Sequence, residues 1–372
     1  MISVKDFKAA GNGIDDDSDA LQKALDMGGE IYIPEGEYKV TKTLKVKSGT
    51  KITADSKARI VHSAEMPKHR GDFLITNSDF ENGNENISIV GGIWDGDYDG
   101  ANNDKPKNLF DEDGWSGTVI NFYNVKNLSL SDMEIANSVV YHTRFCRIDG
   151  FDIRNIRFSA KRLAYNQDGL HFGGECRNGY VENIRAVTDG ETNDDLIALN
   201  ADDSMVRIEN LDLICGDIEN ITFKNIYAKD CHTAIRFLSV NSSIRNIKFE
   251  NVFAGCREFA INMDGARYCA TPLFREEEFP QGCGNIENIE IDGFEFYSTD
   301  DKRQKPLIGC ESRIKNFVIR NMKRTDANSP RAAFRARNIV NTKIVCDKKE
   351  YFAVDKSETV EINGSISEIH IN

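Results

Sequence analysis

A six-residue pattern of alternating apolar and polar positions, apolar-x-Asn-apolar-x-apolar, recurs along the chain. It surrounds eight asparagines: Asn127, Asn155, Asn183, Asn210, Asn220, Asn246, Asn288 and Asn316. Several neighbours in this series lie 26 or 28 residues apart, as Asn155 and Asn183 do. Alternation with a period of two is typical of a strand with one buried face. A strand pattern that returns at a fixed period predicts a solenoid whose repeats pack on one another.

The length of the repeat selects the kind of solenoid. About 27 residues, without a 3.6-residue period, is too short for a helical repeat and fits one coil of a parallel β-helix with about three short strands. We therefore expect an all-β fold, a single-stranded parallel β-helix. The asparagine has a physical role in it, because asparagine tolerates left-handed backbone at a bend and stacked amides can hydrogen-bond from coil to coil.

The N-terminus follows a different pattern. The acidic run 15–19 precedes Leu21, Ala24 and Leu25, which share one face of a helix, and Gly28 follows them. Acidic residues at the start, an apolar stripe and a terminal glycine predict an amphipathic helix. We expect this helix to cap the first coil, whose core cross-section and strand edges are otherwise exposed.

We expect one domain over residues 1–372. Residues of about 1–45 form the N-terminal cap and first coil, and about 328–372 form the closing coils. Two stretches interrupt the period, at about 95–117 and about 264–284. Long insertions between coils are surface loops that often build a binding face, although plain tolerated insertions would look the same in the sequence.

Charge and composition narrow the partners. The net charge of −13 argues against nucleic acid as a main partner, although a local basic pocket could still bind an acidic substrate. No apolar run approaches the roughly 18 residues of a membrane span, so we expect no membrane partner. The sequence does not indicate an oligomeric state.

The cysteines and the N-terminus bear on location. The nine cysteines are odd in number and have no C-x-x-C spacing, so we expect reduced, buried thiols and a reducing compartment. The first residues show no basic-then-apolar leader. We expect a cytoplasmic protein; a secreted protein whose leader has been removed is the alternative.

Three aspartates are selected by the coil length. Asp168 precedes the adjacent pair Asp194 and Asp195 by one coil. Asp168 should therefore lie beside them, on strands about 4.8 Å apart. Neighbouring carboxylates raise at least one pKa, and a paired proton donor and acceptor is what glycoside hydrolysis needs. Turn-capping aspartates and a calcium site are the alternatives.

The segments around these aspartates resemble motifs of glycoside hydrolase family 28, the polygalacturonase family. Asn166-Gln167-Asp168-Gly169 is similar to its N-T-D motif, and Asp194-Asp195-Leu196-Ile197-Ala198 to its D-D motif. Further similar segments are 4–7, 36–38, 91–96 and 137–141, so the resemblance covers about residues 1–320. It implies a right-handed parallel β-helix and hydrolysis with inversion.

The resemblance also implies roles. Asp194 would be the general acid, and Asp168 and Asp195 would hold and deprotonate the attacking water. A separation of roughly 6.5–9.5 Å between acid and base leaves room for that water. Asn166 would contact the substrate.

Two departures from the family affect the expected sugar. Arg236 falls on the arginine of the R-I-K motif, but Leu238 replaces its lysine, and this pair usually holds a uronate carboxylate. The G-H-G motif is missing, with only Ile214-Cys215-Gly216-Asp217 in its place. Three histidines are candidates to compensate by binding substrate: His142, His171 and His232.

We therefore expect an inverting glycoside hydrolase that removes terminal residues from small plant- or microbe-derived oligosaccharides, with altered sugar specificity and without a metal or other cofactor. One alternative is a polysaccharide lyase on the same fold, in which the aspartates would bind Ca²⁺. The other is a non-catalytic carbohydrate-binding β-helix of the tail-fibre kind.

Overall fold

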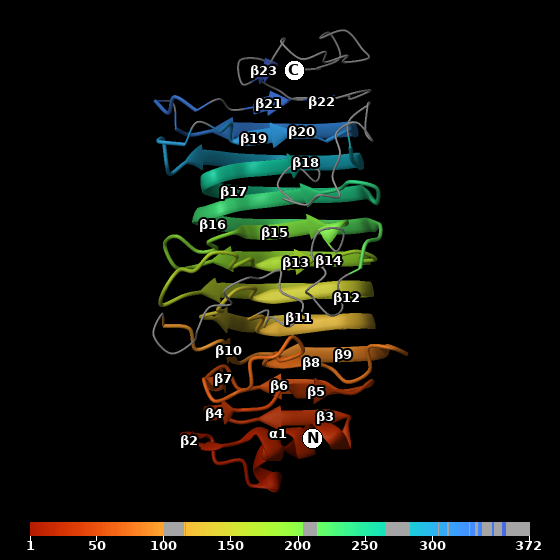
Figure 1. Ribbon diagram of the computed structural model, residues 1–372, viewed down its shortest axis with the longest axis vertical. Helices are drawn as coiled ribbons and strands as arrows, with labels where there is room; N and C mark the ends of the chain where they lie inside the picture. The colour runs from red at the N-terminus through yellow and green to blue at the C-terminus, as the bar shows by residue number, and fades with distance from the viewer. Residues whose placement is uncertain are drawn as a thin grey trace.

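The chain forms a column of stacked coils that rises from its N-terminus (Figure 1). The computed structural model describes residues 1–99, 115, 117–203, 214–264, 283–303, 305–310, 312–326 and 328–331, and the backbone of 334–336, 344–345 and 352–354. The predicted repeat at Asn210 and most of the predicted segments 95–117, 264–284 and 328–372 lie outside these residues.

The described residues form one sheet in which every strand pair is parallel. The first coils use short strands: β1 (Ile2–Ser3), β2 (Asn12–Asp16), β3 (Glu30–Ile33), β4 (Gly36–Val40), β5 (Leu44–Val46), β6 (Lys51–Ala54), β7 (Ala58–His62), β8 (Ile75–Asn77), β9 (Asn84–Val90) and β10 (Ile93–Asp95). The middle of the column has longer ones: β11 (Ile120–Ala136), β12 (Thr143–Ser159), β13 (Leu170–Phe172), β14 (Arg177–Ala186), β15 (Asp195–Asn200), β16 (Ile218–Leu238), β17 (Ser243–Asp264) and β18 (Asn285–Ser298). The last are β19 (Ile308–Cys310), β20 (Ile314–Arg324), β21 (Phe334–Ala336), β22 (Ile344–Val345) and β23 (Phe352–Val354). An all-β, parallel β-helical architecture is therefore confirmed.

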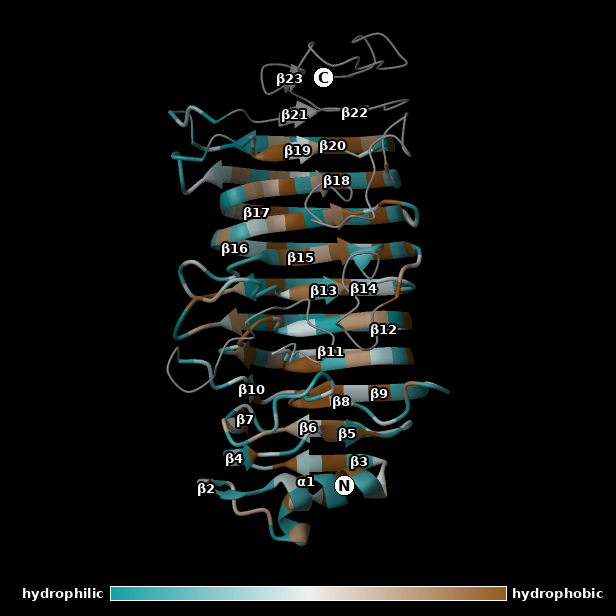
Figure 2. Ribbon diagram, in the orientation of Figure 1, coloured by the Kyte–Doolittle hydropathy of each residue, from teal (hydrophilic) through white to brown (hydrophobic). Residues whose placement is uncertain are grey.

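The core follows the alternation seen in the sequence. Along the strands hydrophobic and hydrophilic residues alternate (Figure 2), and most of the apolar ones join one buried cluster that runs from the first coil to β20. Because neighbouring coils pair in register, like residues stack: the ring centroids of Phe223 and its register partner Phe249 lie 4.6 Å apart, and those of Tyr227 and its register partner Phe253 lie 5.0 Å apart. Such aromatic pairs contribute about 0.5–1.5 kcal/mol each beyond their burial.

Asparagines at the bends have left-handed backbone and bond to one another along the column. Asn246 has φ of 57°; it donates to Asn220 at 3.0 Å and accepts from Asn288 at 3.1 Å. In the described part of the chain, two ladders contain four or more asparagines, and Asn127 forms a separate pair with Asn86, to which it donates at 3.0 Å. The first contains Asn178, Asn220, Asn246, Asn288 and Asn316, and the second contains Asn155, Asn183, Asn225 and Asn251.

The presence of two ladders shows that one spacing in the sequence series, from Asn127 to Asn155, is not the length of one coil. Asn127 and Asn155 do not stack, although they are as far apart in the sequence as Asn155 and Asn183: Asn155 donates to Asp132, and Asn127 lies beside Gly150. The pattern occurs at two bends of a coil, so the spacing between Asn127 and Asn155 does not measure one coil. Between Asn155 and Asn183, which do stack at 2.8 Å, it does.

The predicted N-terminal helix is present. After the short 3-10 helix η1 (Val4–Phe7), α1 runs over Ser18–Met27 and ends before Gly28, whose φ is 68°. Leu21, Ala24 and Leu25 of α1 are buried in the main apolar cluster. The polar face of the helix is exposed, in agreement with its amphipathic sequence.

Seven cysteines lie in the described part of the chain, and all except the half-buried Cys215 are buried. They are Cys146, Cys176, Cys215, Cys231, Cys256, Cys283 and Cys310. Burial raises the pKa of the Cys176 thiol to about 12, so this side chain acts as a small apolar filler. In the described part of the chain, no helix has the length and apolar character needed to cross a membrane.

Candidate active site

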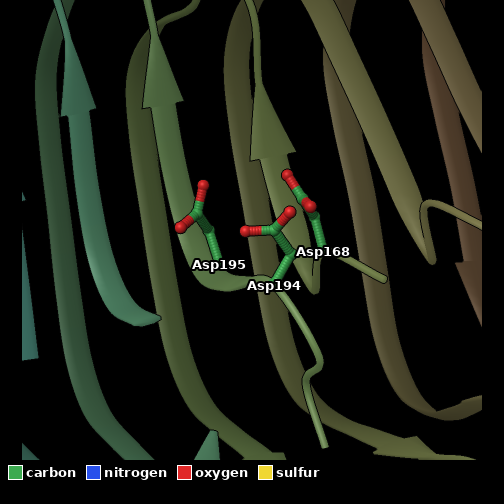
Figure 3. Close-up of side chains that lie close together, drawn as sticks. All are labelled: Asp168, Asp194 and Asp195. Atoms are coloured by element: carbon green, nitrogen blue, oxygen red, sulfur yellow. The ribbon is translucent and has the colours of Figure 1, made fainter. Parts of the chain in front are cut away.

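Three carboxylates meet where two neighbouring coils run side by side (Figure 3). Asp168 precedes β13, and Asp195 begins β15 directly after Asp194. The pairing of Leu170 with Ile197 sets Asp168 opposite Asp195, and the Gly169 amide donates to the Asp195 carbonyl at 2.8 Å. One carboxylate oxygen from each aspartate lies within 4.8 Å of the others. The coil length thus brings these residues together as predicted.

The nearest oxygens of the cluster are at most 4.8 Å apart. The expected separation of roughly 6.5–9.5 Å refers to whole acid and base carboxyl groups and stays a prediction. A water molecule that hydrogen-bonds to two oxygens at about 2.7 Å each spans up to about 5.4 Å. One water can therefore be held between two of these carboxylates.

The three carboxyl groups differ in exposure, and the pKa of one of them is strongly raised. The Asp194 side chain is 22% exposed, whereas those of Asp168 and Asp195 are 5% and 3% exposed. Burial, and after it the Asp194 carboxylate, raises the pKa of Asp195 well above its ordinary value, against the opposing charge of Arg236. Because the groups lie so close, the proton belongs to the cluster as a whole. The surroundings of the cluster therefore favour binding of a proton, and one of its carboxyl groups is open to solvent.

His171 lies behind Asp168 rather than in the open site. Its Nδ1 is 2.6 Å from Asp168 Oδ2, and its Nε2 is 3.0 Å from Asp203 Oδ2. Burial opposes protonation of the ring, but the hydrogen bonds to Asp168 and Asp203 outweigh it and raise the pKa of His171. The side chain is 1% exposed. With both nitrogens engaged and the ring covered, direct sugar contact by His171 is not supported by its position.

The other predicted substrate-binding residues occupy different depths. His142 is wholly buried, with Nδ1 2.9 Å from the Asp168 carbonyl oxygen and Nε2 2.9 Å from Glu191 Oε1, so its expected sugar contact is not supported either. His232 is partly exposed, and its Nδ1 lies 3.5 Å from Asp194 Oδ1. Asn166 is half-buried, two residues before Asp168, with φ of 61°.

Arg236 is shared between carboxylates of two coils. Its Nη1 lies 3.6 Å from Asp195 Oδ2 and its Nη2 3.3 Å from Asp264 Oδ2. Burial opposes the charge, but Asp264 and Asp195 outweigh burial and raise the pKa of Arg236. Leu238, at the position of the family lysine, pairs in register with Asp264. The one arginine kept from the R-I-K motif is thus already neutralised.

Some residues that hold the side chains of this site in place could not have been found from a short sequence motif. Asp203 lies far along the chain from His171, and Glu191 is further still from His142. No short motif contains either pair. The coil length could have suggested Asp264, which follows Arg236 by about one coil and bonds to it, although the register partner of Arg236 is Asn262.

The carboxylate cluster has the oxygen donors that Ca²⁺ prefers, but Ca²⁺ takes about six to eight oxygen ligands. The three aspartates have six carboxylate oxygens between them, and one Asp168 oxygen is bonded to His171. A calcium ion here would therefore also need carbonyl or water oxygens.

The chain belongs to the rhamnogalacturonase A/epimerase, pectate lyase-like family, whose model matches residues 1–257. A probable polygalacturonase of Arabidopsis thaliana is 26% identical over 269 residues, which are 69% of this chain and 54% of that protein. The predicted relationship to the pectin-degrading β-helix proteins is confirmed at the level of the family.

Not all similar proteins carry the name of an enzyme. The preneck appendage protein of Bacillus phage PZA is 26% identical over 190 residues, 51% of this chain and 20% of that protein. The crystal structure of PfbA, a surface adhesin of Streptococcus pneumoniae, matches with a TM-score of 0.57 at 16% identity, over 93% of this chain and 85% of that one. The chain spans about a fifth of the length of the phage relative and about half of the polygalacturonase.

Proposed function

We propose that this protein hydrolyses glycosidic bonds by acid–base catalysis at Asp168, Asp194 and Asp195. One observation carries the proposal: three carboxyl groups from adjacent coils lie within 4.8 Å of one another, and one of them has a strongly raised pKa. Hydrolysis needs a proton for the leaving oxygen and a carboxylate to take a proton from water, and such a cluster supplies both.

Asp194, the most exposed of the three, gives the proton that the cluster shares to the glycosidic oxygen. A water held by Asp168 and Asp195 attacks the anomeric carbon, the bond to the leaving oxygen breaks, and the water proton passes to the carboxylate pair. Asp168 keeps its position through His171. Attack by water on the face opposite the leaving group inverts the anomeric centre.

The substrate in this proposal ends in a neutral sugar. A uronate carboxylate near Arg236 would also meet Asp195 and Asp264, which already neutralise that arginine, and Leu238 supplies no charge. Like charges in a buried site repel strongly because water screens them little. The proposed reaction removes terminal residues from small oligosaccharides.

The test is a hydrolysis screen with matched pairs of oligosaccharides that differ only in a neutral or a uronate terminal residue, each at two to eight units. We expect single neutral sugars to be released and the uronate member of each pair to be cleaved more slowly. Faster cleavage of the uronate member would overturn the substrate assignment. Release of internal fragments would overturn terminal cleavage.

A second candidate function is carbohydrate binding without turnover. The similarity to a phage appendage protein and to an adhesin favours it. Saturable binding of an oligosaccharide with no product from any member of the screen would establish this function. The lyase alternative predicts an unsaturated product that absorbs in the ultraviolet and loss of activity with a chelator.

We also infer the number of domains, the handedness of the helix and the role of its N-terminal segment. Residues 1–372 form a single domain that winds in a right-handed sense. Helix α1 caps its first coil, as the burial of Leu21 and Leu25 in the main apolar cluster supports. Unfolding in one cooperative transition, and aggregation after deletion of residues 1–29, are the corresponding expectations.

A further inference from the structure

Asp194 is carried differently from its two partners. Asp195 lies within β15 and Asp168 is fixed two residues before β13, whereas Asp194 belongs to the connection between β14 and β15. We call residues 187–194 the Asp194 loop. The amides of His232 and Thr233 in β16 donate to the Thr192 and Asp194 carbonyl oxygens at 2.8 and 3.3 Å. Side-chain contacts add to these backbone bonds in setting the place of the Asp194 carboxylate.

Arg257 of β17 provides such contacts from two coils further along the column. Its Nη2 donates to the Gly190 carbonyl at 2.9 Å and to Asn193 Oδ1 at 2.8 Å. Its Nη1 donates to the Asp230 carbonyl at 3.0 Å and lies 3.2 Å from Asp230 Oδ2. The side chain is 20% exposed, so a planar, mostly covered guanidinium links the Asp194 loop to β16.

Asn193 extends this hydrogen-bonded connection to the neighbouring coil. While its Oδ1 accepts from Arg257, its Nδ2 donates to the Ala164 carbonyl at 2.8 Å. Ala164 lies four residues before Asp168, in a segment fixed by Gln167, which accepts from the Ala164 amide and donates to the Ser138 carbonyl at 2.7 Å. One chain of hydrogen bonds therefore joins the segments that carry Asp194 and Asp168.

A second contact joins the same two segments from inside. Glu191 of the Asp194 loop and His142 are both wholly buried, with Nε2 and Oε1 2.9 Å apart. Nδ1 of His142 lies 2.9 Å from the carbonyl oxygen of Asp168. The Asp194 loop is thus held on its inner side by Glu191 and on its outer side by Arg257.

We propose that Arg257 is a positioning residue: through Asn193 it holds the Asp194 carboxyl group in reach of Asp168 and Asp195. The kinetic consequence rests on the proposed function, but the geometric consequence does not. An arginine suits this role because its fork-shaped guanidinium can bond several carbonyl oxygens in fixed directions, which a lysine cannot do. A misplacement of about 1 Å in a catalytic group costs about 100-fold in rate.

The first test is kinetic. For Arg257→Ala we expect a 10- to 100-fold lower kcat with KM changed less than threefold, and partial recovery of kcat on addition of guanidinium. Asn193→Ala should reproduce the loss, but without recovery by guanidinium. Arg245→Ala is the matched control, because Arg245 also lies on β17 and pairs with Glu219 and Asp217 of the preceding coil, away from the carboxylates. An unchanged kcat in folded Arg257→Ala would overturn the proposal.

The second test does not depend on activity. Crystal structures of the wild type, Arg257→Ala and Arg245→Ala give the distances from Asp194 to Asp168 and Asp195. We expect the nearest Asp194 carboxylate oxygen, within 4.8 Å of the others in the wild type, to move beyond that distance in Arg257→Ala alone, with β13 and β15 unmoved. An intact cluster in that variant would refute the positioning role even if the wild type hydrolyses no sugar. Displacement in Arg257→Ala together with an inactive wild type would uphold the role and reject the proposed function.

Discussion

The asparagine ladders and the aspartate cluster use the same stacking of coils in opposite ways. In the ladders, each residue bonds to an identical neutral residue one coil away, as Asn246 does to Asn220 at 3.0 Å. In the cluster, stacking sets like charges side by side, Asp168 against Asp195. Repetition stabilises the ladder, whereas repetition alone would destabilise the cluster.

The cluster persists because unlike residues surround it. Arg236 places a positive charge beside Asp195, His171 hydrogen-bonds to Asp168, and Arg257 anchors the loop of Asp194. None of these supporting residues belongs to the repeating pattern. The difference indicates that regular coils provide the scaffold and that departures from regularity build the chemistry, which is where strain and perturbed pKa values gather in enzymes.

The largest expected effect comes from the cluster. Asp168→Asn keeps the shape of the side chain but removes a proton acceptor, and general base catalysis contributes about 10²- to 10⁴-fold. We expect a loss of about 10³-fold in kcat, measured by product formation. Asp152→Asn is the control, because Asp152 lies in the exposed part of β12 and pairs with Arg154. A loss below tenfold in Asp168→Asn would remove Asp168 from the mechanism.

A change in a ladder should affect stability and leave activity intact. Asn246→Ala loses two amide hydrogen bonds and places an alanine at φ of 57°, so we expect about 1–2 kcal/mol of lost stability. Asn246→Gly removes the same bonds without the backbone penalty and should lose less. Chemical denaturation measures both. Equal losses would show that backbone conformation does not contribute.

Restoring the family lysine should change the sugar preference. Leu238→Lys places a positive charge beside Asp264 and so weakens the ion pair between Asp264 and Arg236. We expect kcat/KM for a uronate-ended substrate to rise about tenfold relative to its neutral partner, about 1.4 kcal/mol. Leu238→Met is the neutral control. A preference that does not move would show that Leu238 does not border the bound sugar.

The smallest expected effect is on stability and depends on pH. The protonated form of Asp195 favours the folded state: this contribution is complete below the pKa of an unfolded aspartate, about 3.9, and is lost as pH rises through the raised pKa of the folded state. Asp195→Asn should therefore raise the unfolding temperature at pH 7 by on the order of 2 °C and have little effect at pH 3. A lower unfolding temperature at pH 7 would contradict the raised pKa.

Sequence reasoning succeeded where the chain keeps its period. Asp168 and Asp195 lie in coils without an insertion, so a separation of one coil length was enough to place them together. The same reasoning misplaced Asn127 against Asn155, because one pattern occurs at two bends of a coil. It missed Asp203 and Arg257, whose contacts cross loops of irregular length. Period predicts neighbours on strands, but not where a long side chain from a loop or a distant coil reaches.

The most direct measurement is a proton NMR time course of a neutral-ended oligosaccharide with the wild type and with Asp194→Asn. We predict that the wild type releases a terminal sugar with inverted anomeric configuration, seen before mutarotation, and that Asp194→Asn releases none because it has no proton to give. Hydrolysis by Asp194→Asn at the wild-type rate would contradict the role of Asp194. A product with retained configuration would contradict direct attack by water held in the aspartate cluster.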